Sequence, residues 1–287
     1  MKVVLFCGGM GMRLREHSDS LPKPMIHIGY RPILWHVMKY YAHFGHKDFI
    51  LCLGHRADII KSYFRNYDET ISNDFILTRG AEVQLVNSDI QDWRVAFVDS
   101  GTNATIGERL KAVEPYLKGE EVFLANYSDG LSDLNLNSYI DEILARGKIA
   151  NFLCVRPTLS FHLVSVRDGG VVNAIEPVSG ADVWINAGFF VFRKDIFGYI
   201  RPGEDLVVEP FGRLINDGQL FAYKYSGFWT AMDTFKDKEH LEDLYARDSA
   251  PWQVWAARRA EGGSSSARPR LRRRFPRFFA WELMRTI

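Results

Sequence analysis

A glycine-rich stretch near the start of the chain has the composition of a phosphate-binding loop. Residues 8–14 read GGMGMRL and residues 21–25 read LPKPM. Glycines after a strand let backbone N–H groups approach phosphates closely, and Arg13 and Lys23 add positive charge beside them. A Walker loop is excluded because no Gly-Lys-Ser/Thr follows, and a dinucleotide fingerprint because Leu14 stands where its third glycine belongs. The stretch suits a nucleoside triphosphate, although a simple tight turn would also explain the glycines alone.

A second candidate lies where a later strand is expected to end. Residues 121–126 (EVFLAN) predict a buried strand, and residues 127–130 (YSDG) place the carboxylate of Asp129 at the carboxyl edge of the sheet. Open α/β sheets usually bind their ligands at this edge. An ordinary turn would also account for an Asp before Gly130. Asp129 is therefore a candidate ligand-binding residue.

The N-terminal part of the chain predicts the unit that positions the glycine loop. The apolar run at residues 3–6 (VVLF) predicts a buried parallel strand that ends at the loop. Apolar side chains recur at helical spacing over residues 34–44, and Gly45 follows as a helix stop. Residues 49–53 (FILCL) predict a second buried strand. Together these elements predict a Rossmann-like β-loop-α-β unit with a right-handed crossover.

The rest of the chain is rich in strand-like runs. Three of them predict a hairpin or a small side sheet before the strand at 121–126, namely residues 75–78, 82–86 and 94–98. A later β-rich half, roughly 150–235, contains the runs 150–155, 161–166, 171–175 and 189–192. We therefore predict an α/β fold of Rossmann-like type. It has a mixed, mostly parallel central sheet, helices on both faces of that sheet and a smaller β-rich half.

Composition excludes several classes of protein. The net charge of +1 gives no reason to expect a nucleic-acid binder. The three cysteines stand far apart in apolar runs, which favours reduced core thiols over disulfides or a zinc site. His36, His43 and His46 lie near one predicted helix but lack a carboxylate or Cys partner at metal-ligand spacing. No apolar stretch reaches the length of about eighteen residues that spans a membrane, and we expect a cytoplasmic protein.

Charge is segregated between the body of the chain and its end. Residues 256–287 hold nine Arg and two Glu, a net charge of +7, so residues 1–255 carry −6 of the total of +1. The Gly- and Ser-rich stretch 261–267 predicts a flexible linker, and the arginines beyond it are interspersed with Phe and Trp. Such a basic aromatic tail suits either an anionic membrane surface or the acidic body of a neighbouring subunit. We predict one nucleotide-processing body at 1–255, followed by a linker and tail at 256–287.

Several short motifs together resemble one enzyme family. The pattern GGxGxRL followed by PKP is similar to that of the sugar-phosphate nucleotidyltransferases. Within that family the chain resembles the glucose-1-phosphate cytidylyltransferases, through residues 23–29 (KPMIHIG), 32–36 (PILWH), 188–190 (GFF), 227–229 (GFW) and 232–234 (MDT). The resemblance spans roughly residues 1–255. It implies that CTP and glucose 1-phosphate form CDP-glucose and pyrophosphate, with Mg²⁺ as cofactor, in a trimeric or hexameric homo-oligomer.

The resemblance also implies roles for individual residues. Arg13 and Lys23 would be catalytic, and Asp129 and Asp233 would hold Mg²⁺. A sugar phosphate oxygen attacks the α-phosphorus of an anionic triphosphate, and this approach of like charges needs several cations in a water-poor cleft. The nucleotide would contact, besides Arg13 and Lys23, residues of the first strand, its loop and the base loop: Phe6, Cys7, Gly8, Gly9, Met10, Gly11, Met12, Ala104, Arg109 and Ser128. The sugar would contact Tyr127, Glu176 and Asn186. These assignments divide the body into a nucleotide-binding part, about 1–130, and an acceptor-binding part, about 131–255.

The chain departs from the family pattern at the acceptor and the base. Pro177 stands where the family has a lysine that binds the sugar phosphate. Met12 replaces a Thr beside the phosphates, Ile106 and Glu108 replace Thr and Gly in the base loop, and Ser128 replaces a Gly. A solvated arginine is the alternative interpretation of Arg109. Transfer onto a different phosphate or phosphonate acceptor is one alternative function, and a non-catalytic regulatory or scaffolding relative is another. Retention of the loop glycines and the charged residues argues against the latter.

Overall fold

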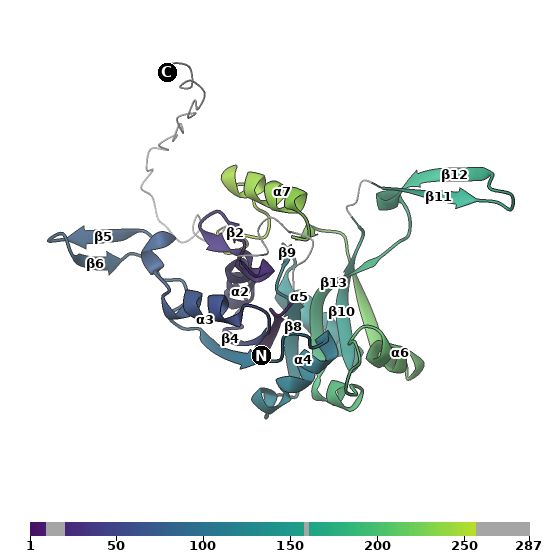
Figure 1. The fold of residues 1–287 in the computed structure, drawn as a ribbon, viewed down its shortest axis with the longest axis horizontal. Coiled ribbons are helices and arrows are strands. Elements are labelled where there is room, and N and C mark those ends of the chain that lie inside the picture. The colour runs from purple at the N-terminus through teal and green to yellow at the C-terminus, as the bar shows by residue number, and fades with distance from the viewer. Residues whose placement is uncertain (10–20, 158–160, 257–287) are drawn as a thin grey trace, which may run out of the picture.

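The computed structural model of the chain describes residues 1–9, 21–157 and 161–256 (Figure 1). Its centre is a seven-stranded sheet in the order β14-β10-β13-β8-β1-β4-β7. The strands are β1 (Lys2–Phe6), β4 (Asp48–Leu53), β7 (Arg94–Asp99), β8 (Val122–Tyr127), β10 (Ala150–Val155), β13 (Ile185–Arg193) and β14 (Leu220–Tyr225). Only β13 runs antiparallel to its neighbours, β8 and β10, while the other described pairs in this sheet are parallel. The predicted mixed, mostly parallel sheet is confirmed.

Helices cover both faces of this sheet because its strands are apolar on both sides. Val3 and Leu5 of β1 belong to one apolar cluster, together with side chains from α2 (Ile33–His43), α3 (Ala57–Arg65) and α5 (Leu136–Arg146). Val4 and Phe6 point the other way, into a second cluster with α4 (Ile106–Ala112) and α6 (Glu209–Asn216). Successive side chains of a strand point to opposite faces, so the continuous run VVLF fills both layers.

The predicted β-loop-α-β unit is confirmed. β1 and β4 pair in parallel, with Val3 opposite Phe49, and α2 connects them. Helix α2 ends before Gly45, which has a φ of +89°, a conformation that glycine adopts without strain. The three cysteines are buried and form no disulfide, as expected. His36 is buried in the core, with one ring nitrogen 3.0 Å from the Ile28 carbonyl oxygen and the other accepting from the Trp252 indole at 3.3 Å.

One expectation about the strands was wrong. The run at 94–98 does not belong to a side sheet, because β7 pairs in parallel with β4 and forms one edge of the central sheet. In the later β-rich half, β10, β13 and β14 continue the sheet that begins with β1. The predicted boundary near residue 130 falls after β8, so the division into a nucleotide part and an acceptor part stays an interpretation of binding roles.

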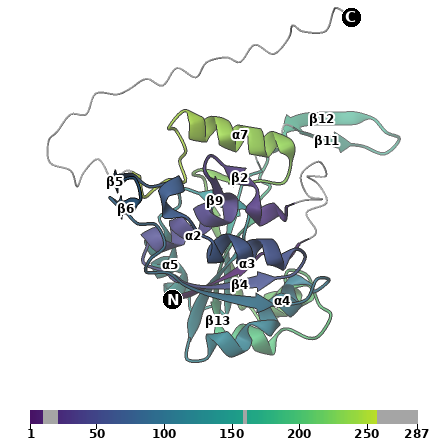
Figure 2. The same ribbon diagram turned by 60° about the vertical axis from the view of Figure 1, so that its left-hand side comes forward.

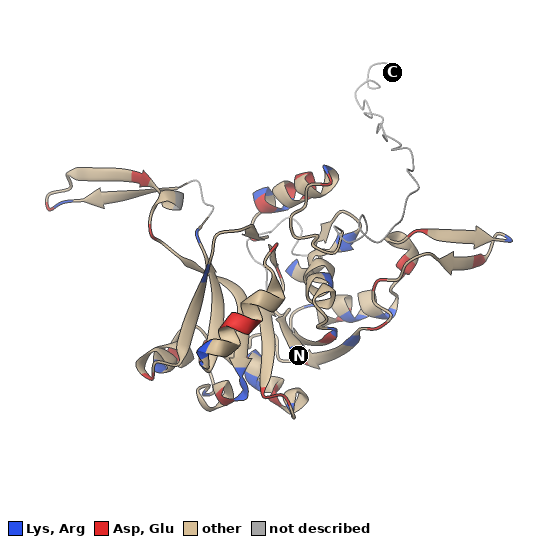
Figure 3. Cartoon of the chain, turned by 180° about the vertical axis from the view of Figure 1, so that it is seen from behind, with Lys and Arg blue, Asp and Glu red and all other residues tan. Residues whose placement is uncertain are grey.

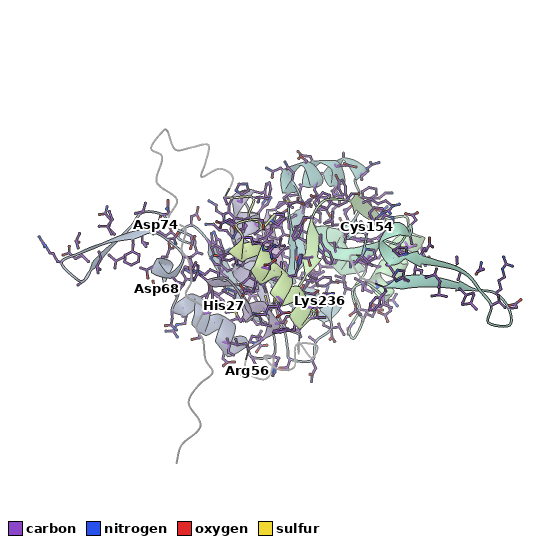
Figure 4. All side chains as sticks on the ribbon, turned by 90° about the horizontal axis from the view of Figure 1, so that it is seen from above. His27, Arg56, Asp68, Asp74, Cys154 and Lys236 are labelled. Carbon is purple, nitrogen blue, oxygen red and sulfur yellow. The ribbon has the colours of Figure 1, made fainter. Side chains whose placement is uncertain are left out.

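Two hairpins project from opposite ends of the molecule (Figures 1 and 2). One joins β5 (Phe75–Thr78) to β6 (Glu82–Leu85), and the other joins β11 (His162–Val166) to β12 (Val172–Pro177). Figure 4 shows the first beyond Asp74 and the second on the side of Cys154, with side chains standing out from both. Neither hairpin is paired with the central sheet.

The remaining elements are short or lie above the carboxyl edge of the sheet. Strand β2 (His27–Ile28) pairs with β3 (Arg31–Pro32), and β9 (Gly130–Ser132) pairs with β15 (Trp229–Ala231). Helix α7 (Phe235–Ala246) follows β15 and packs over β2 (Figure 2). Five single 3-10 turns complete the described elements: η1 (Lys23–Met25), η2 (Glu69–Ile71), η3 (Glu114–Leu117), η4 (Val178–Gly180) and η5 (Lys194–Gly198).

Candidate active site

Two aspartates that are far apart in the sequence meet because β9 pairs with β15. Gly130 lies opposite Ala231 in this antiparallel pair, and the N–H of Met232 donates to the carbonyl oxygen of Asp129 at 3.0 Å. Asp129 precedes β9 and Asp233 follows β15, so both carboxylates lie at the same end of the pair. The Asp233 backbone N–H also donates to the Asp237 carboxylate in the first turn of α7 at 3.1 Å, which holds Asp233 at the start of that helix.

Lys23 lies between these two carboxylates. Its Nζ is 2.5 Å from Oδ2 of Asp129 and 2.5 Å from Oδ1 of Asp233. The two oxygens therefore cannot be more than 5.0 Å apart, twice that distance. Burial lowers the pKa of Lys23, but the charges and hydrogen bonds of Asp129 and Asp233 outweigh burial and raise the pKa above its ordinary value. Lys23 is thus a fixed cation at neutral pH, held by residues more than a hundred positions away.

The same two carboxylates have the chemistry of a divalent-metal site. Both are hard oxygen donors that converge on one point, as Mg²⁺ requires, and Mg²⁺ typically takes only one or two protein carboxylates and completes its shell with phosphate oxygens and water. No group of three or more His, Cys, Asp and Glu side chains among the described residues is placed to hold a metal ion. The two aspartates therefore fit Mg²⁺, which needs few protein ligands, better than they fit a metal ion that is held entirely by protein side chains.

A cleft of about 660 Å³ opens above this ion-paired group at the carboxyl edge of the sheet. Its lining contains twelve residues singled out in the sequence: Phe6, Cys7, Gly8, Gly9, Lys23, Ala104, Arg109, Tyr127, Ser128, Asp129, Asn186 and Asp233. They come from the ends of β1 and β8, from the start of β13 and from the loops around them. The structure thus brings together residues that are spread over most of the chain.

Arg109 forms the floor of the cleft. It is 2% exposed, so the interpretation as a solvated arginine was wrong. Its guanidinium donates to the Leu53 carbonyl at 3.2 Å, the Ser100 hydroxyl at 2.8 Å and the Thr102 carbonyl at 3.2 Å. A Cβ at Gly8 would overlap this guanidinium, which gives a steric reason for glycine there. Arg109 therefore supports the end of β4 and the loop that follows β7, close to Gly8.

The loop expected to contact the base ends at the N-terminal cap of helix α4. Thr105 is the N-cap of α4, and its hydroxyl accepts from the Glu108 N–H at 3.2 Å while Glu108 accepts from the Thr105 N–H at 2.9 Å. The sequence Thr-x-x-Glu is the signature of this capping box. Glu108 also accepts from the Gly203 N–H at 3.1 Å. Glu108 departs from the family pattern in the base loop. Its role in the N-terminal cap of α4 explains why a glutamate stands at this position.

Residues at the ends of β1 and β8 hold the cleft wall in place. The Ser128 hydroxyl donates to the Phe6 carbonyl oxygen at 2.8 Å and thereby ties the two strand ends together. Burial raises the pKa of the Cys7 thiol to about 12, so Cys7 is a neutral wall residue. Burial, with the negative charges of Asp205 and Asp129, also raises the pKa of Tyr127, whose hydroxyl interacts with Asn186. Tyr127 and Asn186, both expected to contact the sugar, thus share one wall.

Some predicted site residues do not line this cleft. Glu176 and Pro177 lie on the exposed strand β12, outside the cleft of their own chain. Met10, Gly11, Met12 and Arg13 lie outside the described residues.

Other lining residues were not expected from the sequence. Asp205, Trp229, Ala231, Pro24, Thr105 and Ala187 belong to this set. Trp229 stands in the GFW motif, and its indole N–H donates to the Ala187 carbonyl at 3.0 Å, so that motif was a usable signal. Asp205 had no such signal.

Comparison with known proteins places this geometry in a family. A model of the nucleotidyl transferase family matches residues 2–237. The chain is 38% identical over 256 residues to a glucose-1-phosphate cytidylyltransferase of Salmonella typhimurium, which covers 89% of this chain and all of that relative. It is 25% identical to a mannose-1-phosphate guanyltransferase of Candida albicans over 84% of this chain and 63% of the relative.

A solved structure shares the fold at low sequence identity. UDP-glucose pyrophosphorylase from Acinetobacter baumanii aligns with a TM-score of 0.63 and 16% identity over 91% of this chain and 98% of that one. Among the residues that the structure describes, no helix is long and apolar enough to cross a membrane. The sheet, the cleft at its carboxyl edge and the family match lead to one conclusion: this chain belongs to the nucleotidyl transferase family.

Proposed function

We propose that this chain is a glucose-1-phosphate cytidylyltransferase, which forms CDP-glucose and pyrophosphate from CTP and glucose 1-phosphate. An oxygen of the sugar phosphate attacks the α-phosphorus of CTP, the bond between the α-phosphorus and its bridging oxygen breaks, and pyrophosphate leaves. The observation that carries the proposal is the group formed by Lys23, Asp129 and Asp233 in one cleft. The curated relative of Salmonella typhimurium, matched over its whole length, supports the choice of CTP and glucose 1-phosphate.

The roles of the residues follow from their chemistry. Lys23 neutralises charge on the phosphates as the two anionic substrates approach, and Arg13, outside the described residues, is proposed to do the same from the glycine loop. Asp129 and Asp233 would hold Mg²⁺, which when bound draws phosphate oxygens into line and screens their charge. Phe6, Gly8, Ala104 and the loops that Arg109 supports would enclose the nucleotide. Tyr127 and Asn186 would contact the sugar through hydrogen bonds to hydroxyl groups.

A screen of pyrophosphate release tests this proposal. Four nucleoside triphosphates are each combined with a panel of sugar 1-phosphates in the presence of Mg²⁺, and the pair of CTP with glucose 1-phosphate is expected to release pyrophosphate fastest. A folded protein that binds CTP but releases no pyrophosphate with any acceptor would instead be a non-catalytic nucleotide-binding relative.

A second candidate is cytidylyl transfer to a different phosphate or phosphonate acceptor. The lysine expected on the acceptor phosphate is absent at Pro177, and no described Lys, Arg or His lines the cleft beside Tyr127 and Asn186. The panel therefore includes phosphates other than glucose 1-phosphate.

We also propose that the chain forms a homo-oligomer through its two hairpins. Apolar side chains are about half exposed on both, among them Ile76 (51%), Val83 (50%), Val164 (51%) and Ile175 (63%). Figure 3 shows that the strands of both hairpins carry few charged residues. An isolated two-stranded hairpin is marginally stable in water, and exposed apolar patches mark sites of association. A trimer or hexamer, the assembly that the resemblance implies, would cover these surfaces. The basic tail beyond residue 256 lies outside the described residues, and its two proposed partners, a neighbouring subunit and a membrane surface, remain alternatives.

A further inference from the structure

Helix α7 begins directly after one of the two candidate metal ligands. Asp233 precedes the N-cap residue Thr234, and the carboxylate of Asp233 contacts Lys23 in the cleft. The side chain of Asp233 is 46% exposed, whereas that of Asp129 is 22% exposed. A half-exposed carboxylate has few neighbouring side chains to hold it in place. The position of Asp233 therefore depends mainly on how its backbone is fixed.

The backbone of Asp233 is fixed by the carboxylate of Asp237. One oxygen, Oδ2 of Asp237, accepts from the Asp233 N–H at 3.1 Å, from the Thr234 N–H at 2.8 Å and from the Thr234 hydroxyl at 2.8 Å. The Thr234 hydroxyl in turn accepts from the Asp237 N–H at 3.2 Å and completes a capping box. Asp237 is not among the residues that line the cleft. It can therefore act on a metal ion only through Asp233 or through its own charge.

The bond to Asp233 is an addition to what helix capping requires. A capping box joins the N-cap residue to the third residue of the helix, as Thr105 and Glu108 do in α4. The other oxygen of Glu108 accepts from the Gly203 N–H at 3.1 Å, in a different loop. In α7 the box carboxylate instead reaches the residue before the cap, which is Asp233.

The last turns of α7 contact the segment that carries Lys23. The carboxylate of Glu242 accepts from the Gly29 N–H at 3.1 Å, in the turn between β2 and β3. Gly29 has a φ of +61°, and a Cβ there would overlap the Tyr245 ring, so α7 packs directly on this turn (Figure 2). Lys23 lies in η1, immediately before β2. One helix thus connects the backbone of Asp233 to the segment of Lys23.

We propose that Asp237 is a positioning residue for the metal–nucleotide complex. It fixes Asp233 at the start of a helix whose other end is attached to the Lys23 segment, and so keeps the Asp233 carboxylate directed at the same point as that of Asp129. This inference rests on the proposed nucleotidyl transfer and concerns the same site. Loss of a group that orients a metal ligand typically weakens metal binding about 10–100-fold. Asp237 should therefore affect metal affinity in addition to stability.

Binding of Mn²⁺, a probe for the Mg²⁺ site, measures this role without turnover. The full chain is titrated with Mn²⁺ in the presence of CTP, and the electron paramagnetic resonance signal of free Mn²⁺ gives the affinity. Asp237→Ala should weaken Mn²⁺ binding about tenfold or more. Asp237→Asn removes the charge but keeps an oxygen that can accept from both backbone N–H groups, and it should restore most of the affinity.

Asn135→Ala is the matched control. It removes the N-cap of α5, where the Asn135 side chain accepts from the Ser138 N–H at 3.1 Å, outside the cleft. This variant loses a helix cap of comparable kind and should keep the Mn²⁺ affinity of the original chain. Glu242→Ala is the second variant. It breaks the bond to Gly29 and should weaken Mn²⁺ binding in the same direction as Asp237→Ala, because α7 is then free to shift relative to Lys23.

The outcomes separate failure of this inference from failure of the proposed function. Equal Mn²⁺ affinities for Asp237→Ala and Asn135→Ala would overturn the role of Asp237, while pyrophosphate release by the original chain would still support nucleotidyl transfer. An Asp237→Asn variant as weak as Asp237→Ala would show that charge acts instead of position, and would also overturn it. An unchanged affinity in Glu242→Ala would overturn the part assigned to the attachment of α7.

The Mn²⁺ comparison also holds if the original chain releases no pyrophosphate. The proposed function then fails, but the affinities of the variants still decide the role of Asp237. If the original chain with CTP does not bind Mn²⁺, Asp233 is not a metal ligand and the inference is overturned.

Discussion

Lys23 is the residue on which the account depends most. In the sequence it is a lysine between two prolines, and in the structure its ammonium lies between two carboxylates that arrive from distant loops. Its position near phosphates was predictable, because a lysine on a loop stiffened by two prolines places a positive charge where it can bind an anion. Its contacts with Asp129 and Asp233 were not predictable, because they depend on the pairing of β9 with β15.

Replacement of Lys23 should disable catalysis while the protein stays folded. Lys23→Ala removes a preorganised cation from the phosphate site, and we expect kcat/KM to fall by about 100-fold or more. Steady-state pyrophosphate release measures this effect. Lys61→Ala on the exposed side of α3 is the matched control and should retain full activity. A Lys23→Ala enzyme with unchanged kcat/KM would remove Lys23 from the mechanism.

The site residues differ in how much of their placement could be predicted from the local sequence. Gly8, Lys23 and Asp129 were predictable because each stands in a local motif with a physical purpose. The burial of Arg109, which rules out the alternative of a solvated arginine, was not predictable because it depends on Leu53, Ser100 and Thr102, which the fold brings around its guanidinium. Asp205 was missed because a carboxylate in a loop has no signature until the loop is folded over Thr105.

At the scale of elements, local strand patterns were predictable and their partners were not. The apolar runs of β1, β4 and β8 correctly indicated buried parallel strands. The run that became β7 reads like its neighbours β5 and β6, yet it pairs with β4 because Trp93 packs on Phe49 and the side chain of Arg94 binds Asp48. Pairing of this kind is decided by contacts that are distant in sequence.

Strand β13 contains a glycine whose replacement should damage both stability and acceptor binding. Gly188 has a φ of +75°, and a Cβ there would overlap the Tyr127 ring. Gly188→Ala should therefore lower the free energy of unfolding by about 1–3 kcal/mol and raise the KM for the acceptor as Tyr127 shifts. Denaturant unfolding and steady-state kinetics measure the two effects.

Gly218→Ala is the matched control for this prediction. Gly218 has a φ of +63°, but no atom lies within 4 Å of a Cβ placed there. It should show the cost of backbone strain without any change in acceptor KM. Equal acceptor KM values for the two variants would contradict the role assigned to Tyr127.

The contact of α2 with the C-terminal segment predicts sensitivity to acid. Burial lowers the pKa of His36 to about 4 from 6.5, and its ring accepts from the Trp252 indole in the neutral form. Because the folded pKa is below the unfolded one, the stabilisation is complete above pH 6.5 and is lost as pH falls toward 4. We expect a loss on the order of 3 kcal/mol from this residue.

Denaturant unfolding between pH 7 and pH 4 measures this loss. His36→Gln should flatten the pH dependence of the free energy of unfolding, whereas His240→Gln, on the exposed side of α7, should leave it as in the original chain. A His36→Gln protein with an undiminished slope would show that other groups cause the acid sensitivity.

At the scale of the whole molecule, the two hairpins are the feature that a single chain does not explain. They leave from opposite ends of the body and expose apolar side chains on strands that touch no other sheet (Figure 1). For residues 75–86 the sequence correctly predicted a hairpin or small side sheet, whereas for residues 161–175 it predicted strands without indicating that they would stand apart from the body. Surfaces at opposite ends suit ring-like association of identical chains.

Charges placed on one hairpin should weaken that association. Val164→Asp together with Ile175→Asp introduces like charges at residues that face each other across β11 and β12. The mass measured by light scattering should fall below that of the original assembly. Asp substitutions at His162 and Asn173, polar positions of the same hairpin, serve as the control. An unchanged mass in the apolar double variant would exclude this hairpin from the interface.

The central claim is that the cleft transfers a cytidylyl group with the help of Lys23 and two metal-binding aspartates. Phosphorus NMR of the protein with CTP, glucose 1-phosphate and Mg²⁺ tests it most directly, because it resolves the diphosphate of the sugar nucleotide and free pyrophosphate in one spectrum. We predict that both products appear in equal amounts, that excess chelator stops their formation, and that Asp129→Asn and Asp233→Asn each slow it strongly. Product formation that continues at the same rate in excess chelator, or in either Asn variant, would contradict it.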